Sequence, residues 1–417
     1  MRIALLTIGS RGDVQPFVVL GAELRGRGHE PVLVSGADFR GMAERAGIGF
    51  RALDTIGTDH ATSVLTDPGV RAALRKGPSL YRMAAAVPRP PRADRRALTD
   101  ELVAATEGVD MIVNTTLTRI GALTRSTAPW CSVASWPITA TATWPAMGAP
   151  ALPLGGRYNR LTHQASSALE WLLYRPEVNA GRAAAGLPKF GLGSPFRDDG
   201  VVRPILYQFS PHVFPPPPDW PARCHVTGYW SDDVRWDQPA ELTEFVERGE
   251  PPLVAAFGSA WLVGGETLLA ASVAAAAETG RRLVVVGGPV GDLPDHVDAI
   301  RSESADFTWL LPRAAAVLHH GGQGTTAAVV SAGVPQVIVP TYADQPMWAA
   351  RMAALGVAAP PVPYSRLTAS SLAAAVRAAV DDPAIADRAF ALAGAVRGDR
   401  GVREAADVVE SYAATGR

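Results

Sequence analysis

Apolar runs of strand length alternate along the chain with amphipathic segments of helix length. Residues 2–8 are almost entirely apolar and predict a strand that ends at a glycine-bearing loop, residues 9–13. Residues 16–27 predict a helix, and residues 31–34 predict the next strand. The apolar side chains that share one face of this helix are Phe17, Val18, Leu20 and Leu24. Strand, helix and strand in this order form the repeating unit of a parallel sheet.

The same alternation returns in the second half of the chain. The apolar runs that predict strands there are residues 252–257, 282–286, 314–318 and 336–339. Between the halves lies a segment with four consecutive prolines, which favour an extended spacer. The chain has 417 residues, more than one hydrophobic core usually supports. We therefore predict an α/β protein with two domains, residues 1–209 and 225–400, joined by a proline-rich linker at 210–224.

The stretch HHGGQGTT follows the predicted strand 314–318 and leads into an alanine- and valine-rich segment of helical length. A glycine loop before a helix presents free backbone N–H groups at the positive end of the helix dipole. Glycines also let an anion approach the backbone closely. An ordinary glycine turn between strand and helix is the simpler alternative. The residues that we expect around a phosphate or diphosphate are His319, His320, Gly321, Gly322, Gly324, Thr325 and Thr326.

The next predicted strand, residues 336–339, ends in a loop that carries Asp344 and Gln345. In a parallel sheet, ligands bind beyond the carboxyl ends of the strands. A carboxylate and an amide at this place suit the hydroxyl groups of a sugar, one loop away from the predicted phosphate site.

The loop after the first strand carries Asp13, with Ser10 and Arg11 beside it. It lacks the glycine patterns of dinucleotide sites and of P-loops, so its contribution is a carboxylate at the carboxyl end of the sheet. Alternatively, Asp13 caps the following helix, since aspartate is common at that position.

Aromatic side chains and methionine gather in the middle of the chain, where Trp136, Trp144 and Met147 lie close together in sequence. They can belong to the hydrophobic core. The alternative is an apolar pocket for an acceptor substrate, formed by adaptable loops.

Two of these motifs resemble one family. The segment His319 to Gln345 is similar to the C-terminal signature of nucleotide-sugar-dependent glycosyltransferases with the two-domain B-type fold. The opening GSRGDVQP, from Gly9 to Pro16, resembles the sterol glucosyltransferase and glycopeptide-antibiotic branches. The resemblance implies two Rossmann-like domains that face each other across a cleft, with a C-terminal helix at 401–417 that packs back on the first domain.

The resemblance also implies roles for single residues. Asp13 matches an aspartate that serves as the catalytic base in the antibiotic branch, and plant relatives carry a histidine in that loop. Ser10, Arg11 and Ser259 are expected near the diphosphate. Trp309 and Leu310 are expected beside the nucleobase.

The composition of the chain limits the classes of molecule that it is expected to bind. The net charge is −1, which offers no global field for nucleic acid or an anionic membrane. The two cysteines lack metal-type spacing, and no signal peptide or apolar run of spanning length is evident, so we expect a bacterial cytoplasmic protein, monomeric or homodimeric. No DxD motif lies in a suitable place, since Asp198-Asp199 and Asp232-Asp233 are adjacent pairs near turns. We therefore expect no metal and no cofactor.

The predicted activity is an inverting transfer of a hexose from a UDP- or dTDP-sugar to a hydroxyl group of an apolar natural product, such as a macrolide, a polyketide, a glycopeptide or a sterol-like aglycone. Two alternatives stay open. A nucleotide-sugar epimerase can share the scaffold and would work without an acceptor. A non-catalytic nucleotide-binding partner protein would not need Asp13 or Asp344.

Overall fold

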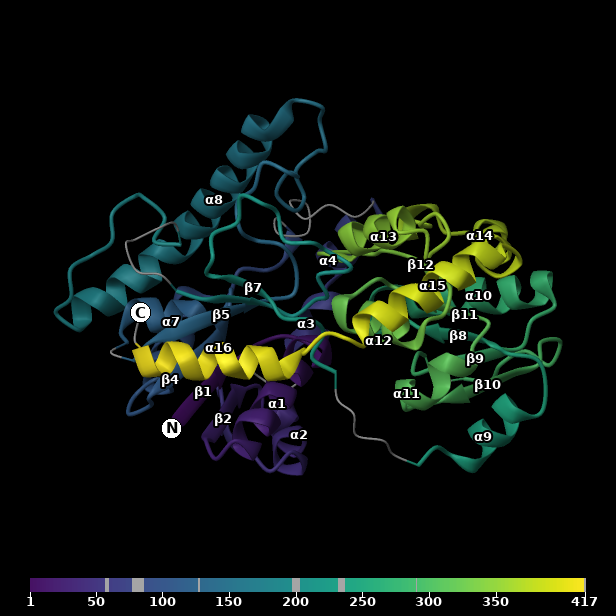
Figure 1. Cartoon of the computed structure of the whole chain (residues 1–417), viewed down its shortest axis with the longest axis horizontal. Coiled ribbons are helices and arrows are strands. Elements are labelled where there is room, and N and C mark those ends of the chain that lie inside the picture. Colours follow the sequence, from purple (N-terminus) through teal and green to yellow (C-terminus); the bar gives the residue numbers. More distant parts are fainter. Residues whose placement is uncertain are drawn as a thin grey trace. The chain divides into compact units, whose positions relative to one another are not determined.

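The computed structural model describes residues 1–56, 60–76, 86–126, 128–196, 203–231, 237–289 and 291–415. The chain divides into two compact units, each an α/β structure built on a parallel sheet (Figure 1). The first unit holds residues 1–61, 89–231 and 399–417, and the second holds residues 62–88 and 232–398. The predicted pair of α/β domains is thus confirmed.

The first unit is a seven-stranded parallel sheet in the order β3-β2-β1-β4-β5-β6-β7. Its strands are β1 (Arg2–Leu6), β2 (Glu30–Ser35), β3 (Gly49–Ala52), β4 (Met111–Thr115), β5 (Trp130–Ala134), β6 (Ile205–Tyr207) and β7 (Cys224–Val226). The strand order reverses between β1 and β4, which is where open α/β sheets bind ligands.

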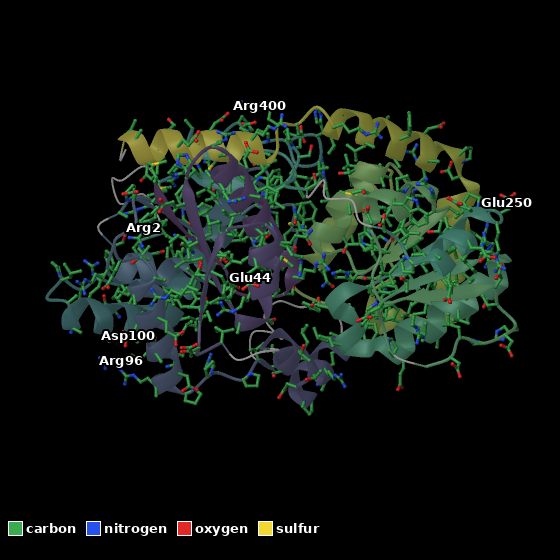
Figure 2. All side chains as sticks on the ribbon, turned by 90° about the horizontal axis from the view of Figure 1, so that it is seen from below. Arg2, Glu44, Arg96, Asp100, Glu250 and Arg400 are labelled. Atoms are coloured by element: carbon green, nitrogen blue, oxygen red, sulfur yellow. The ribbon has the colours of Figure 1, made fainter. Side chains whose placement is uncertain are left out.

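Helices cover both faces of this sheet. They are α1 (Arg11–Gly26), η1 (Ala37–Phe39), α2 (Arg40–Arg45), α6 (Arg92–Ala104), α7 (Arg119–Thr124), α8 (Gly155–Ala184) and the C-terminal α16 (Val402–Thr415). On one face, Leu5 and Phe17 pack with Val409 of α16; on the other, Leu6 packs with Trp171 of α8. Arg96 and Asp100 lie exposed at the surface, one turn apart on α6 (Figure 2).

Helix α1 begins earlier than the predicted residue 16. Ser10 occupies the N-cap position, so the helix starts at Arg11 and Pro16 lies inside it. Pro16 is the sixth residue of the helix, past the first turn, so its missing N–H removes one helical hydrogen bond, the one to the Gly12 carbonyl. The glycine-bearing loop is therefore shorter than expected, and Asp13 lies within the first turn of α1.

The second unit has a five-stranded parallel sheet in the order β10-β9-β8-β11-β12. Its strands are β8 (Leu253–Ala256), β9 (Leu283–Val286), β10 (Ala299–Ser302), β11 (Ala316–His319) and β12 (Gln336–Ile338). Its helices are α3 (His60–Thr66), which begins in the first unit, α4 (Pro68–Arg75), α9 (Ala240–Glu247), η2 (Gly258–Ala260), α10 (Trp261–Thr279), α11 (Phe307–Leu310), η3 (Leu311–Arg313), α12 (Gln323–Ala332), α13 (Gln345–Ala354), η4 (Tyr364–Arg366), α14 (Ala369–Asp381) and α15 (Pro383–Val396).

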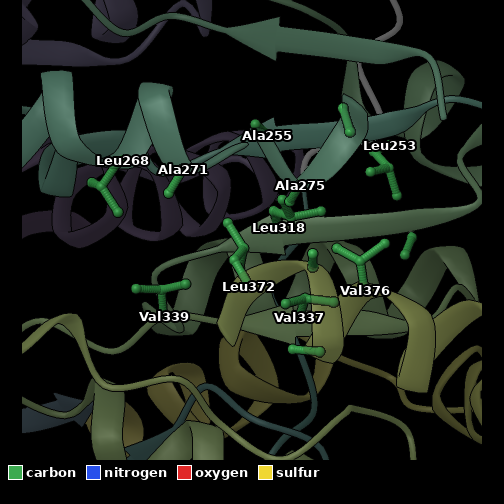
Figure 3. Packing of buried hydrophobic residues seen from close by; sticks show 14 of the residues in the cluster. Leu253, Ala255, Leu268, Ala271, Ala275, Leu318, Val337, Val339, Leu372 and Val376 are labelled. Atoms are coloured by element: carbon green, nitrogen blue, oxygen red, sulfur yellow. The ribbon is translucent and has the colours of Figure 1, made fainter. Parts of the chain in front are cut away.

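The largest hydrophobic cluster of the second unit lies between its sheet and the pair α10 and α14, and another covers the other face of the sheet. Leu318 and Val337 of the strands belong to one buried cluster with Leu268 of α10 and Leu372 of α14 (Figure 3). Strands buried on both faces need continuous apolar runs, which is why they were evident in the sequence. Among the described helices, one stretch, Gly258–Thr279, is long and apolar enough to span a membrane, judged by length and composition only. Its packing in this core accounts for that composition.

Two segments do not belong to the parts of the chain to which the predicted domain boundaries assign them. The proline-rich segment 210–224, predicted as the linker, does not run between the units but belongs to the first unit, where Trp220 stacks on Tyr207 at 4.6 Å. Residues 62–88, expected in the first domain, belong to the second unit. There, Val70 and Leu74 of α4 are buried against Val263 of α10. A sequence pattern shows that such a helix has an apolar face, but it does not show which core covers that face.

Candidate functional site

Three adjacent strands of the second unit, β8, β11 and β12, end at the same edge of the sheet. The loops that follow them carry most of the predicted donor-binding residues. These are Ser259 after β8, His319 to Thr326 at and after β11, and Asp344 with Gln345 after β12. The topology thus brings the predicted phosphate and sugar residues to one edge of one sheet.

His319 is fully buried and supports the loop. The Gly321 N–H donates to its Nδ1 at 3.2 Å, so Nε2 carries the proton that faces Gln336 Oε1 at 3.1 Å. Burial disfavours the cation and, together with neighbouring His320, lowers the pKa of His319 to about 3. Both ring nitrogens are occupied within the protein. We therefore assign His319 to the loop structure and not, as predicted from the sequence, to the diphosphate.

His320 is 7% exposed and lies between two glycines. A Cβ atom added to Gly322 would lie 2.4 Å from its Nε2, and one added to Gly258 would lie 3.3 Å from its Cε1. Burial lowers the pKa of His320 to about 4, so the ring is neutral at pH 7. Its Nδ1 is buried and has no hydrogen-bond partner in the described part of the chain. Of the two histidines, His320 is the one with hydrogen-bonding capacity to spare.

Helix α12 starts directly beside this ring, with Gly322 as its N-cap. Its first turn contains no acidic residue, so the positive end of the helix dipole is not neutralised from within. Gly324 is exposed and Thr325 is partly exposed, whereas Thr326 is buried, with a hydroxyl that has no partner among the described residues. The N–H groups at the start of the helix, a neutral imidazole and a positive helix end form a site suited to an anion.

The loop after β12 is held by its own hydrogen bonds. Gln345 Oε1 accepts from the Thr341 N–H at 2.8 Å and hydroxyl at 2.5 Å, and from the Tyr342 N–H at 3.0 Å. Only the amide nitrogen of Gln345 is then left for a ligand. Asp344 is partly exposed and accepts from the Trp348 indole at 2.8 Å. Ala343, directly before Asp344, has φ +51°, a strained value for a residue other than glycine.

Two supporting residues were not predicted from the sequence. The hydroxyl groups of Tyr342 and Ser259 lie 2.7 Å apart, which ties the β12 loop to the β8 turn. Gln336 holds His319, as described above. A glutamine inside an otherwise apolar strand was the one signal that could have indicated a buried polar partner.

The two residues expected beside the nucleobase differ in their surroundings. Leu310 is fully buried in the core, so its side chain cannot contact a base. Trp309 is partly exposed, with the Arg313 guanidinium 4.9 Å from its ring centre. It lines a polar pocket of about 400 Å³ together with Asp306, Thr308 and neighbouring side chains. Trp309 stays a candidate for the base, and Leu310 does not.

In the first unit, Asp13 occupies the third position of α1 and forms a capping box with Ser10. Its Oδ2 accepts from the Ser10 N–H at 2.7 Å and from the Ser10 hydroxyl at 2.9 Å. A Cβ atom on Gly9, which has φ +142°, would lie 2.4 Å from that oxygen. Oδ1 accepts no hydrogen bond from any described residue. Ser10, and not Asp13, is therefore the N-cap, and one carboxylate oxygen of Asp13 remains for a substrate.

Burial raises the pKa of Asp13, and the two bonds from Ser10 oppose that shift. A raised pKa makes the carboxylate a stronger base than an ordinary aspartate. Arg11 is exposed and donates to Gln15 at 3.1 Å. Ser10 and Arg11 thus belong to the first unit, whereas the other predicted diphosphate residues belong to the second.

Trp136, Trp144 and Met147 are all partly exposed and lie on the segment between β5 and α8. Trp144 makes edge contacts with Phe214 at 5.9 Å and with Trp220 at 6.3 Å. It therefore belongs partly to an aromatic cluster. The described residues contain no group of three metal-ligating side chains, and the pairs at 198–199 and 232–233 lie outside them.

The buried histidines predict a pH dependence of stability. The unfolded chain protonates both rings near pH 6.5, whereas the folded protein keeps them neutral down to about pH 4. The stabilisation of the folded protein by the two neutral rings is therefore complete above pH 6.5 and is lost as the pH falls from 6.5 towards 4. At pH 5 each ring is expected to lower the free energy of unfolding by roughly 2 kcal/mol relative to pH 7.5.

Urea titrations at both pH values measure this loss. His320→Leu is expected to reduce the difference in the free energy of unfolding between the two pH values by roughly 2 kcal/mol. An equal difference in the variant and the wild type would show that His320 is already protonated or exposed in the folded protein.

Comparisons with known proteins agree on the class of enzyme. Residues 282–410 match the family model of the erythromycin biosynthesis protein CIII-like C-terminal domain, and residues 3–87 match that of the glycosyltransferase family 28 N-terminal domain. The chain is 49% identical over 424 residues to the O-mycaminosyltylonolide 6-deoxyallosyltransferase of Streptomyces fradiae, covering 100% of this chain and 98% of that protein.

More distant relatives extend the comparison. A sterol 3-beta-glucosyltransferase of Arabidopsis thaliana is 30% identical over 96% of this chain, which spans 64% of that protein. The crystal structure of the glycosyltransferase VinC in complex with dTDP matches with a TM-score of 0.67 at 21% identity, over 99% of both chains. At this identity the likeness concerns the fold, and it confirms the predicted B-type architecture of two Rossmann-like domains.

Proposed function

This chain belongs to the glycosyltransferase family that includes the tylonolide 6-deoxyallosyltransferase, and on that premise we propose that it transfers a hexose or deoxyhexose from a nucleoside diphosphate to a hydroxyl group of a macrocyclic or polycyclic aglycone. The acceptor class follows the name of the relative that is 49% identical. A dTDP-sugar is the preferred donor in this proposal, because solved relatives of the same fold hold thymidine diphosphate.

The main observation in support of this proposed reaction is the anion site at the start of α12. Departure of a nucleoside diphosphate builds negative charge on phosphate oxygens, and stabilisation of growing charge lowers the barrier most. The positive end of α12 and the neutral ring of His320 provide donors at one place. No step in this account needs a metal ion, since the helix end and the N–H groups meet the charge of the leaving group.

Asp13 is the proposed general base. As the acceptor oxygen forms its bond to the anomeric carbon, its proton passes to the free Oδ1 of Asp13, and the bond from that carbon to the diphosphate breaks. Attack from the face opposite to the leaving group inverts the configuration. The capping bonds from Ser10 fix Oδ2, so that the carboxylate presents its other oxygen. Asp344 and the amide nitrogen of Gln345 are proposed to hold sugar hydroxyls.

Mass spectrometry of products from panels of dTDP- and UDP-sugars, each with macrolide and polyketide aglycones, tests the activity. Proton NMR of the product gives the anomeric configuration, and inversion is expected. A donor that is isomerised without any acceptor would instead support the epimerase alternative. Nucleotide binding without either reaction would support a non-catalytic partner protein. We place the reaction in the bacterial cytoplasm, where nucleotide sugars are made.

A further inference from the structure

We propose that Asp219 and Trp220 are positioning residues that clamp the acceptor loop, defined as residues 135–154 between β5 and α8. The inference rests on the proposed function, because it takes this loop to recognise the acceptor. The two residues follow the proline run 215–218, which the sequence alone marks as a linker. In the structure they belong to the first unit and bind the loop through side-chain and backbone atoms.

Asp219 joins the loop to helix α8. Its Oδ1 accepts from the Thr141 hydroxyl at 2.7 Å, and its Oδ2 accepts from the Ala142 N–H at 2.9 Å. Oδ2 also accepts from Arg160 of α8 at 2.8 Å. A single carboxylate thus holds the backbone of the loop, one of its side chains and the helix that follows it.

These bonds keep Asp219 ionised. The Thr141 hydroxyl, the Ala142 N–H and Arg160 together lower the pKa of Asp219 to about 2, against the cost of partial burial. The side chain is 23% exposed. Hydrogen bonds to an ionised acceptor are stronger than neutral ones, so the clamp is complete above about pH 4 and weakens only in acid.

Trp220 holds the loop at Thr139, two residues before Thr141. Its indole N–H donates to the Thr139 carbonyl at 3.2 Å, and its ring stacks on Tyr207 with centres 4.6 Å apart and planes 16° apart. The Tyr207 hydroxyl donates to the Thr139 hydroxyl at 2.6 Å and accepts from the Thr139 N–H at 2.9 Å. Tyr207 lies at the end of β6, so the sheet itself anchors the loop.

The proline run explains why this arrangement holds its shape. Consecutive prolines have few accessible conformations, so little entropy is lost when the segment is fixed. The Trp220 N–H donates to the Pro217 carbonyl at 3.1 Å, which turns the chain and directs Asp219 and Trp220 to the loop. Trp144 then packs against Trp220 and Phe214. A loop held at residues 139–142 presents Trp136, Trp144 and Met147 in one conformation, which lowers the entropy cost of binding an acceptor.

Asp219→Asn in the full chain tests the clamp. The asparagine amide cannot accept from all three donors, and the acceptor KM is expected to rise about tenfold, the usual effect of losing one charge-assisted hydrogen bond. The kcat and the Kd for dTDP are expected to change less than threefold. Trp220→Phe keeps an aromatic ring to stack on Tyr207 but removes the indole N–H that bonds the Thr139 carbonyl, and a smaller rise in KM is expected. Asp298→Asn is the matched control, since Asp298 accepts from Arg248 and Arg282 at the surface of the second unit.

Hydrogen–deuterium exchange gives a result that does not depend on activity. The amides of residues 139–147 are expected to exchange faster in Asp219→Asn than in the wild type, while those of α1 and α12 stay unchanged. Unchanged exchange in this segment, or an unchanged acceptor KM, would overturn the inference. A fall in kcat, dTDP affinity and Tm together would also overturn it, by showing a general structural role. Absence of any sugar transfer by the wild type would refute the proposed function and leave the exchange result to decide on the clamp.

Discussion

Asp13→Asn is expected to lower the kcat of sugar transfer by about 10²- to 10⁴-fold, the usual cost of losing a general base. Asparagine retains the shape of the side chain and can still accept from Ser10, so the capping box of α1 and the fold are preserved. The Kd for dTDP, measured by calorimetry, is expected to change less than twofold, because the proposed nucleotide site lies in the second unit. Single-turnover kinetics with the preferred acceptor measure the chemical step directly.

Asp110→Asn provides the control for this experiment. Asp110 precedes β4 and accepts from the Arg2 N–H at 2.7 Å, at the amino ends of the strands and away from the proposed site. Its substitution is expected to leave transfer within twofold of the wild type. If Asp13→Asn turned over as fast as this control, the acceptor proton would have to go to another group.

Gly322→Ala is expected to weaken dTDP binding by about tenfold or more. The added Cβ would lie 2.4 Å from Nε2 of His320, so the ring or the start of α12 must move. Such overpacking typically costs about 1 to 3 kcal/mol, and here the groups displaced are those proposed to bind the diphosphate. Calorimetric titration with dTDP measures the loss, and the Tm reports how much of it reflects stability.

Gly394→Ala is the matched control for that substitution. Gly394 lies in α15 of the same unit, and a Cβ atom added there meets nothing within 4 Å. Alanine in a helix is favoured over glycine by roughly 0.5 to 1 kcal/mol, so a small rise in stability and unchanged binding are expected. Equal dTDP affinity in both variants would mean that the crowding of His320 is irrelevant to the nucleotide.

The elements that the sequence predicts well are those whose pattern has a single physical cause. The strands of the second sheet are continuous apolar runs because helices cover both of its faces. The turn from β11 into α12 is evident because glycine is needed where His320 fills the space of a side chain. These two features together predicted the fold and the phosphate loop.

Other features depend on contacts that a pattern does not contain. Helix α8 was not predicted, because exposed leucines such as Leu169 and Leu172 blur its apolar face and its sequence contains a proline, Pro176, through which the helix nevertheless continues. The adjacent histidines look equivalent in sequence, yet Gln336 makes one of them structural. The proline run predicted a linker because its stiffness is local, whereas the stacking of Trp220 on Tyr207 joins residues distant in sequence.

The central claim is that the loop from His320 to Thr326 binds the diphosphate of the donor. A crystal structure of the protein with dTDP tests it most directly. The account predicts the β-phosphate within hydrogen-bonding distance of the N–H groups at the start of α12, with a ring nitrogen of His320 as a further partner. A diphosphate bound elsewhere, with this loop empty, would contradict it.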